Sequence, residues 1–128
     1  MTLEDIKEWL QVQIKAPAFF IGKIDSSIDN CIGVYNIPGP SPNVAIGGLQ
    51  NTTYAIKSIS ILVHWGKNSN AAELKAQEIY NKLFCQNAVI KGKRVILFDV
   101  RTSGPIDVGT DDKGIYEYVI QTNIIYER

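Results

Sequence analysis

The side chains that most often perform chemistry are few in this chain and far apart. His64 is the one histidine, and the two cysteines, Cys31 and Cys85, are separated by more than fifty positions. Catalysis by a serine or cysteine nucleophile needs a histidine base, and a structural zinc ion needs four ligands. We therefore expect no catalytic residue, no metal and no cofactor, with His64 on a sheet surface and both cysteines as small core residues.

Acidic residues gather near the end of the chain, at Asp107, Asp111 and Asp112. A calcium-binding EF-hand loop beginning at Asp107 would need glycine at its sixth position and glutamate at its twelfth. The chain has Asp112 and Tyr118 at those positions, so turn formation is the better interpretation of these acids.

Phosphate-binding and nucleic-acid-binding patterns are also incomplete. The pair Gly66-Lys67 is followed by asparagine, and Ile61 stands where a Walker A motif needs its first glycine. Basic residues at 91–94 occur in a chain with 13 Lys+Arg, 13 Asp+Glu and zero net charge. This balance favours a solvent-exposed hairpin turn over a nucleic-acid-binding site. A small hydrolase with a carboxylate pair distant in sequence stays open as an alternative.

The sequence predicts two amphipathic helices. Thr2 and Asp5 fit a capping box for the first helix, which ends before Pro17. Asn70 and Glu73 fit a capping box for the second helix. The apolar residues at helical spacing are Leu3, Ile6, Leu10 and Ile14 in the first helix and Ala72, Ala76, Ile79 and Leu83 in the second.

Alternating or short apolar runs predict the strands, at residues 19–24, 31–37, 54–65, 89–90, 94–100 and 115–126. Residues 91–93 form the turn of a hairpin in this interpretation. The element order predicts one α+β domain over residues 1–128. Its mixed, largely antiparallel β-sheet would carry two α-helices packed on one face.

Two long connections, residues 38–53 and 101–114, interrupt this order. Connections of this length are often functional, although a plain surface loop is as consistent with the pattern. Two tyrosines border the first connection, and tyrosine is enriched at interface hot spots. The candidate interaction residues are Tyr35, Pro38, Pro40, Pro42, Gly47, Gly48, Tyr54, Pro105, Asp107, Asp111 and Asp112.

Targeting signals are not expected in this chain. The first residues after the methionine include acidic side chains, whereas a signal peptide begins with basic residues. No apolar run reaches 18 residues. Export and membrane spanning are therefore disfavoured, and we expect a protein without a membrane segment in a reducing cytoplasm.

Several short stretches, in order along the chain, resemble small bacteriophage minor capsid proteins of the tail-terminator type. They are a Leu3-x-x-Ile6 helix followed by FIGK at 20–23, VYNIPGPSP at 34–42 with AIGG at 45–48, Ala76-x-x-Ile79-Tyr80-x-x-Leu83, and Pro105 with Gly109-x-Asp111-x-x-Gly114-x-Tyr116-Glu117 and a closing Glu127-Arg128. This resemblance covers essentially the whole chain.

The resemblance implies a structural protein of a long-tailed bacteriophage or prophage with a tail-terminator-like α+β fold. Such a protein is made in the bacterial cytoplasm and ends in the virion, at the junction of tail and head. Its partners would be itself, as a ring that is expected to be a hexamer, the tail tube protein and the head connector or completion protein. DNA would touch the ring lumen only passively, where acidic residues such as Asp107, Asp111 and Asp112 would repel it.

Other functions stay open at this point. A head-completion (neck) subunit has a similar size and the same structural character. A cytoplasmic binding module that presents the proline-containing segment as a ligand is a third possibility, beside the small hydrolase.

Overall fold

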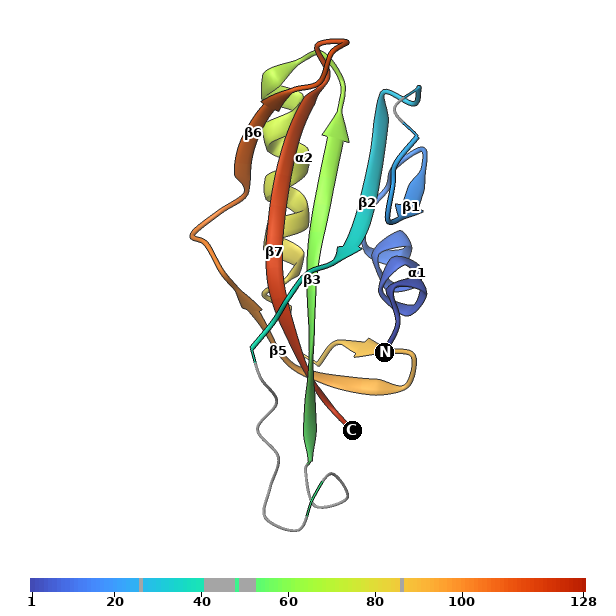
Figure 1. Ribbon diagram of the computed structural model, residues 1–128, viewed down its shortest axis with the longest axis vertical. Helices are drawn as coiled ribbons and strands as arrows, with labels where there is room; N and C mark the ends of the chain where they lie inside the picture. Colours follow the sequence, from blue (N-terminus) through green and yellow to red (C-terminus); the bar gives the residue numbers. More distant parts are fainter. Residues whose placement is uncertain (26, 41–47, 49–52, 86) are drawn as a thin grey trace.

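The computed structural model describes residues 1–25, 27–40, 48, 53–85 and 87–128. Two helices and a curled, mixed, largely antiparallel sheet of seven strands form an α+β fold, which confirms the predicted class (Figure 1). The elements are α1 (Leu3–Gln13), β1 (Phe19–Ile21), β2 (Asn30–Asn36), β3 (Tyr54–Trp65), α2 (Ser69–Lys82), β4 (Val89–Ile90), β5 (Lys93–Val100), β6 (Ile106–Thr110) and β7 (Tyr116–Glu127).

Strand β7 lies in the interior of the sheet. The strand order is β1-β2-β3-β7-β5-β4, and β6 also pairs with β7. Strand β5 pairs with residues 122–126 of β7, whereas β6 pairs with residues 116–119, so the two strands share successive parts of β7. Only β1 and β2 run parallel among the paired strands described.

The antiparallel pair of β3 and β7 determines the length of the molecule. Each strand has 12 residues, and their register runs from Tyr54 opposite Glu127 to His64 opposite Glu117. At about 3.3 Å per residue, Tyr54 and His64 are roughly 33 Å apart. Figure 1 shows the start of β3 at one end of the long axis and the turn between β6 and β7 at the other.

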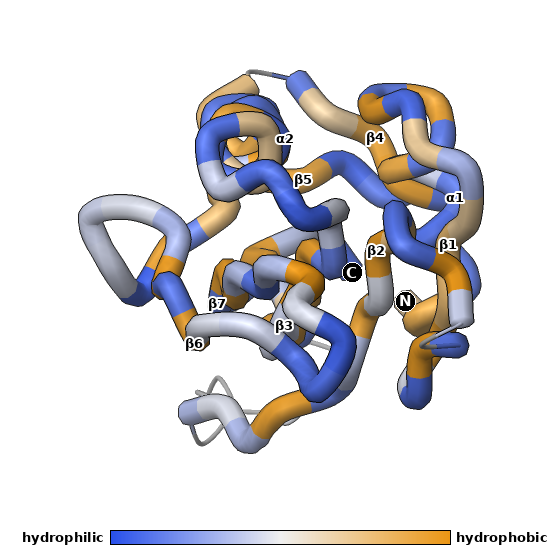
Figure 2. The backbone as a smooth tube through the Cα atoms, turned by 90° about the horizontal axis from the view of Figure 1, so that it is seen from above, coloured by the Kyte–Doolittle hydropathy of each residue, from blue (hydrophilic) through white to orange (hydrophobic). Residues whose placement is uncertain are grey.

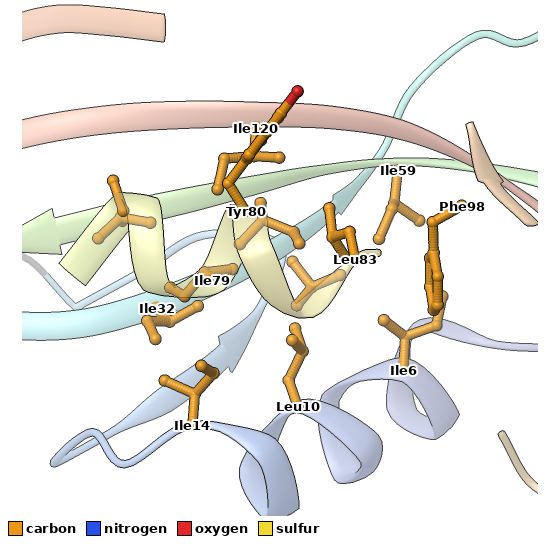
Figure 3. Close-up of a cluster of buried hydrophobic side chains, with 14 of the residues drawn as sticks. Ile6, Leu10, Ile14, Ile32, Ile59, Ile79, Tyr80, Leu83, Phe98 and Ile120 are labelled. Atoms are coloured by element: carbon orange, nitrogen blue, oxygen red, sulfur yellow. The ribbon is translucent and has the colours of Figure 1, made fainter. Parts of the chain in front are cut away.

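The core lies on one face of the sheet, because alternate side chains of β3 and β7 point to the same side. Both helices pack on that face (Figure 3). Each fully buried aliphatic side chain there contributes roughly 1.5–3 kcal/mol to stability. The core confirms the predicted helical stripes, with Leu3 only partly buried at its margin. It includes Ile6, Leu10, Ile14, Ala72, Ala76, Ile79 and Leu83 of the helices and Ile59, Ile61, Val63, Tyr118, Ile120 and Ile124 of the strands.

The helix starts confirm one capping prediction and correct the other. Thr2 Oγ1 accepts a hydrogen bond from the Asp5 main-chain nitrogen, and the Asp5 carboxylate accepts one from the Thr2 nitrogen, which completes the predicted capping box. In α2 the N-cap is Asn68, whose Oδ1 accepts from the main-chain nitrogens of Asn70 and Ala71. The predicted Asn70 cap is wrong because Asn68 satisfies these donors two residues earlier.

The main differences from the predicted strands concern β1 and β6, whereas the bounds of β2, β5 and β7 shift by one residue. Strand β1 stops at Ile21 because Gly22 adopts a positive φ of 72° and turns the chain out of the extended conformation. The predicted hairpin is confirmed, with positive φ at Lys91 and Gly92 in its turn. The predicted continuous loop at 101–114 is wrong, since residues 106–110 form β6 and pair with β7.

Candidate assembly surfaces

Metal-binding groups do not come together in the described part of the chain. Across residues 1–25, 27–40, 48, 53–85 and 87–128, no cluster of three or more His, Cys, Asp or Glu side chains is placed to hold a metal ion. The helices in these ranges are too short or too polar to cross a membrane. Cys31 is buried as predicted, but Cys85 is exposed, because it follows the last turn of α2 and leaves the buried stripe.

Arg101 joins the two connections that interrupt the predicted order of elements. Its Nη2 donates hydrogen bonds to the main-chain oxygen of Pro38 (3.0 Å) and to Oδ1 of Asn123 (2.9 Å). Ser58 Oγ donates to the same Asn123 oxygen at 2.7 Å. These contacts hold the segment after β2 against the sheet face opposite the helices, where the second connection begins.

Gly39 is required at its position for steric reasons. A Cβ atom on this residue would overlap the side chain of Ser58, which is itself buried on that sheet face. The neighbouring Pro38 and Pro40 are exposed, so the segment rests on the sheet through its backbone. Pro42 and Gly47 lie outside the described residues, and Gly48 is described with a positive φ of 89°.

The two tyrosines that border the first connection have different environments. The ring of Tyr35 lies beside Gly33 on the sheet, and its partial burial raises the pKa of the phenol. Tyr54 opens β3 opposite Glu127 and is half-buried at the end of the long axis. Of the two, Tyr54 is therefore the one placed at an end of the molecule.

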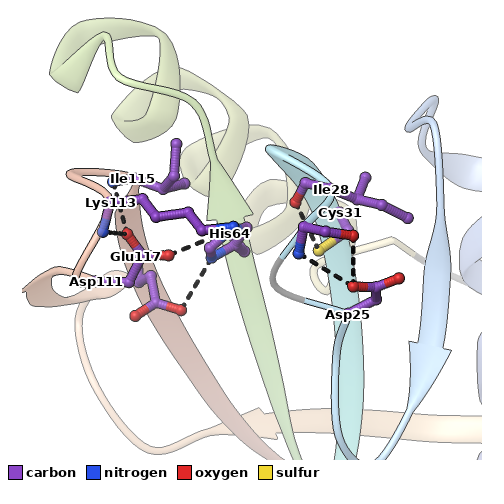
Figure 4. Close-up of polar contacts among 9 residues, drawn as sticks. Asp25, Ile28, Cys31, His64, Asp111, Lys113, Ile115 and Glu117 are labelled. Atoms are coloured by element: carbon purple, nitrogen blue, oxygen red, sulfur yellow. Dashed lines mark hydrogen bonds and ion pairs between the residues drawn. The ribbon is translucent and has the colours of Figure 1, made fainter.

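His64 is fully buried, so its prediction as a surface histidine is wrong. Its Nδ1 lies 3.1 Å from Glu117 Oε2, and its Nε2 lies 3.7 Å from Asp111 Oδ2 (Figure 4). Although His64 is on the face opposite the helices, these two side chains, from β7 and from the turn before β7, lie against its ring. The Glu117 contact therefore joins β7 to the end of β3, and Asp111 places the turn beside the ring.

The three clustered acids are in three different environments. Asp111 Oδ1 accepts hydrogen bonds from the main-chain nitrogens of Lys113 and Ile115, both at 2.9 Å, which confirms turn formation at this residue. The Ile115 hydrogen bond is the main cause that lowers the pKa of Asp111. Asp107 lies in β6 and accepts from the Gly109 nitrogen at 2.8 Å, whereas Asp112 is exposed.

Strand β6 is the most exposed strand of the described sheet. All five of its residues are exposed, including Ile106 and Val108, and Pro105 lies half-buried just before it. It pairs with β7 on one side, and no other described strand pairs with its outer edge. A bulge between Asp107 and Gly109 interrupts the register.

Sequence patterns did not identify the polar residues that anchor the two connections, namely Ser58, Arg101, Glu117 and Asn123. Their partners are 22 to 65 residues away along the chain. The available signal was weak. Ser58, Glu117 and Asn123 occupy outward-facing positions of long strands, where a polar residue without a partner is equally common.

Residues 4–128 of the chain match the protein family described as bacteriophage tail terminator protein. No curated protein matches the chain. The family match spans every element described above apart from the first residue of α1, and it includes both anchored connections and the exposed strand β6.

Proposed function

Since this chain belongs to the bacteriophage tail terminator family, we propose that it forms a ring on the tail tube, stops its growth and joins it to the head. A structural role in the phage tail follows from the family itself. The finer assignment includes a hexameric ring of identical subunits, with the tube protein and the head connector as further partners.

The position of the two anchored connections carries this proposal. The segment that Arg101 holds leads to one end of the β3–β7 pair, where Tyr54 lies. The turn that Asp111 stabilises through its two main-chain hydrogen bonds lies at the opposite end (Figure 1). A subunit that contacts a tube below and a head above needs two separate surfaces at its two ends, and the anchored segments near the two ends of the β3–β7 pair support this assignment.

The acidic residues have a narrower role in this proposal than the sequence suggested. Asp111 is directed at His64 and stabilises its turn, so it is not available to line a channel. Asp112 is exposed on the same turn and makes no ion pair within the described residues. We assign to Asp112 the repulsion of DNA that passes through the ring.

Electron microscopy of phage particles made without this gene tests the proposed function. Tails of uncontrolled length with unattached heads are the expected result, because nothing would stop polymerisation of the tube. Restoring the gene in trans should restore tails of uniform length, which controls for effects on neighbouring genes.

Two other outcomes would contradict the proposal in different ways. Tails of normal length beside leaking heads would assign the chain to head completion. Intact, infectious particles would remove any structural role in the virion and favour a binding module or a hydrolase.

A further inference from the structure

A pocket of about 390 Å³ lies at the end of the molecule where β3 begins. Its lining comes from both ends of the chain and from strands β3, β5 and β7. Figure 1 and Figure 2 both show the points marked N and C close together. We call this cavity the β5–β7 pocket, and its lining residues are Met1, Ala55, Lys93, Tyr126 and Arg128.

Strand pairing brings the polar side chains of this pocket to one face of the sheet. Tyr126 is paired with Val95, whose side chain is buried in the core. Lys93 lies two residues before Val95 and Arg128 two residues after Tyr126, so strand alternation directs both to the face that carries the helices. The main-chain nitrogen of Arg128 donates a hydrogen bond to the oxygen of Thr53 at 3.1 Å, which keeps Arg128 in line with β7.

The polar groups of the pocket have no partners within the described part of the chain. The ammonium of Lys93, the guanidinium of Arg128 and the hydroxyl of Tyr126 make no hydrogen bond or ion pair with any described side chain or main-chain group. The adjacent Arg94 is different, because it donates two hydrogen bonds to Glu127, at 2.9 and 2.6 Å. The pocket therefore holds two cations and a hydroxyl that are available to a ligand.

Carboxylate side chains of the described residues do not line this pocket. Glu127 alternates with Tyr126, so it lies on the other face of the sheet with Arg94. In the first turn of α1, Asp5 accepts a hydrogen bond from the main-chain nitrogen of Thr2, and Glu4 lies 3.6 Å from Lys7. An anion that enters the pocket therefore meets a positive potential.

We propose that the β5–β7 pocket binds a phosphate group. Ammonium, guanidinium and phenol groups are hydrogen-bond donors, and lysine and arginine are the side chains that most often bind phosphate oxygens. A tetrahedral phosphate presents oxygens in several directions, so it can accept from donors on β5 and β7 together. A carboxylate has only two oxygens in one plane. The volume of the pocket is within the range of small-molecule sites.

Titration of the full chain with inorganic phosphate tests the site, with the ionic strength kept constant by potassium chloride. We expect saturable shifts of the amide resonances of Ala55, Lys93 and Arg128 in two-dimensional nitrogen–proton spectra. Potassium acetate at the same ionic strength should give much weaker binding. Absence of saturable shifts with phosphate would overturn the proposal, and equal binding of acetate would overturn the choice of phosphate.

Variants of the two cations test whether the phosphate binds in this pocket. Lys93→Gln and Arg128→Gln should each weaken phosphate binding about tenfold, because each loses a charge-assisted hydrogen bond. Tyr126→Phe should weaken binding less, because it removes a neutral donor.

Lys67→Gln is the matched control, since Lys67 is an exposed lysine that follows the other end of β3 and does not line the pocket. It should bind phosphate like the wild type, and an equal loss there would show a general effect of net charge and overturn the site. Lys93 and Arg128 are exposed, so both variants should unfold at the wild-type temperature in chloride.

A short duplex DNA distinguishes two sources of the phosphate group. If the DNA backbone supplies it, duplex DNA should bind, and Lys93→Gln and Arg128→Gln should weaken that binding while Lys67→Gln does not. If free phosphate is the ligand, only the titration with inorganic phosphate should depend on these two variants. Either result supports the pocket.

This inference does not depend on the proposed ring, because the titrations use the isolated chain. Loss of the phosphate response in the wild type would reject the pocket and leave the terminator role in place. A deletion that leaves tail length unchanged would reject the terminator role and leave the pocket in place.

Discussion

The guanidinium of Arg101 donates a hydrogen bond to the main-chain oxygen of Pro38, 63 residues earlier in the chain. Through Asn123 the same group is connected to Ser58 on β3. One side chain therefore fixes the exit from β2 relative to the two central strands, and its removal should weaken the fold measurably.

Replacement of Arg101 with alanine should lower the free energy of unfolding by about 1–2 kcal/mol. The variant loses the two hydrogen bonds that the charged guanidinium donates at an exposed site. Urea denaturation measures this change. Arg94→Ala is the matched control, since Arg94 also donates two hydrogen bonds, but to the carboxylate of Glu127, and both of these side chains are about half exposed. That pair should contribute less than about 1 kcal/mol, so an equal loss in both variants would contradict a special role for Arg101.

Gly39→Ala should destabilise the protein by roughly 1–3 kcal/mol, because the added Cβ overlaps the Ser58 side chain and forces the segment off the sheet. Thermal unfolding measures the effect. Gly104→Ala is the control, since a Cβ there meets no atom within 4 Å. The combination Gly39→Ala with Ser58→Gly should recover part of the loss, and failure to recover would place the strain elsewhere.

Replacement of His64 with leucine should cost about 1–3 kcal/mol of stability, because Glu117 loses its hydrogen bond to Nδ1 and its carboxylate is left facing that of Asp111. Chemical denaturation measures the loss. Glu117→Gln should cost less, since an amide can still hydrogen-bond to the His64 Nδ1. A neutral effect of His64→Leu would show that the cluster does not stabilise the turn.

The stability difference between the wild type and Asp111→Asn should depend on pH. Hydrogen bonding in the folded protein lowers the pKa of Asp111, so its carboxylate stabilises the fold fully above the ordinary aspartate pKa of about 3.9. This contribution is lost as the pH falls through the lowered pKa of the folded state. Denaturation at pH 7 and near pH 2 should show the difference shrinking in acid, and Asp112→Asn is the matched control.

The two cysteines should react at very different rates. Burial raises the pKa of Cys31 to about 11, so its thiolate is scarce near pH 8 and is also shielded from reagents. Cys85 is exposed. Mass spectrometry after alkylation should find one adduct in the folded protein, none in Cys85→Ser, and two in wild-type protein after unfolding. Rapid double labelling of the folded protein would contradict the structure.

Local periodicity was enough to predict the helices, the long strands and their buried faces. The stripe through Ile6 and Leu10 and the alternation from Ile59 to Val63 repeat within a few residues, so they can be recognised without knowing the fold. Strand β6 could not be predicted in this way, because Asp107 and Gly109 disfavour strands and its pairing is set by β7.

The candidate functional sites could not be predicted, because their contacts join residues that are far apart in the sequence. The alternation of β3 correctly placed His64 on the outward face, but its burial comes from Glu117 and Asp111, which approach from a different strand and turn. In the same way, the proline-containing segment was recognised from composition, whereas its anchor at Arg101 required the folded chain.

The interior position of β7 constrains when the protein can fold during its synthesis. Residues 116–127 leave the ribosome after β3, β5 and β6, the three strands with which they pair. Until they emerge, these three strands have no common neighbour, and the hydrophobic side chains of β3 and α2 have no complete core to enter. A nascent chain that lacks β7 therefore cannot complete the sheet or the core, so folding of this chain follows translation of β7.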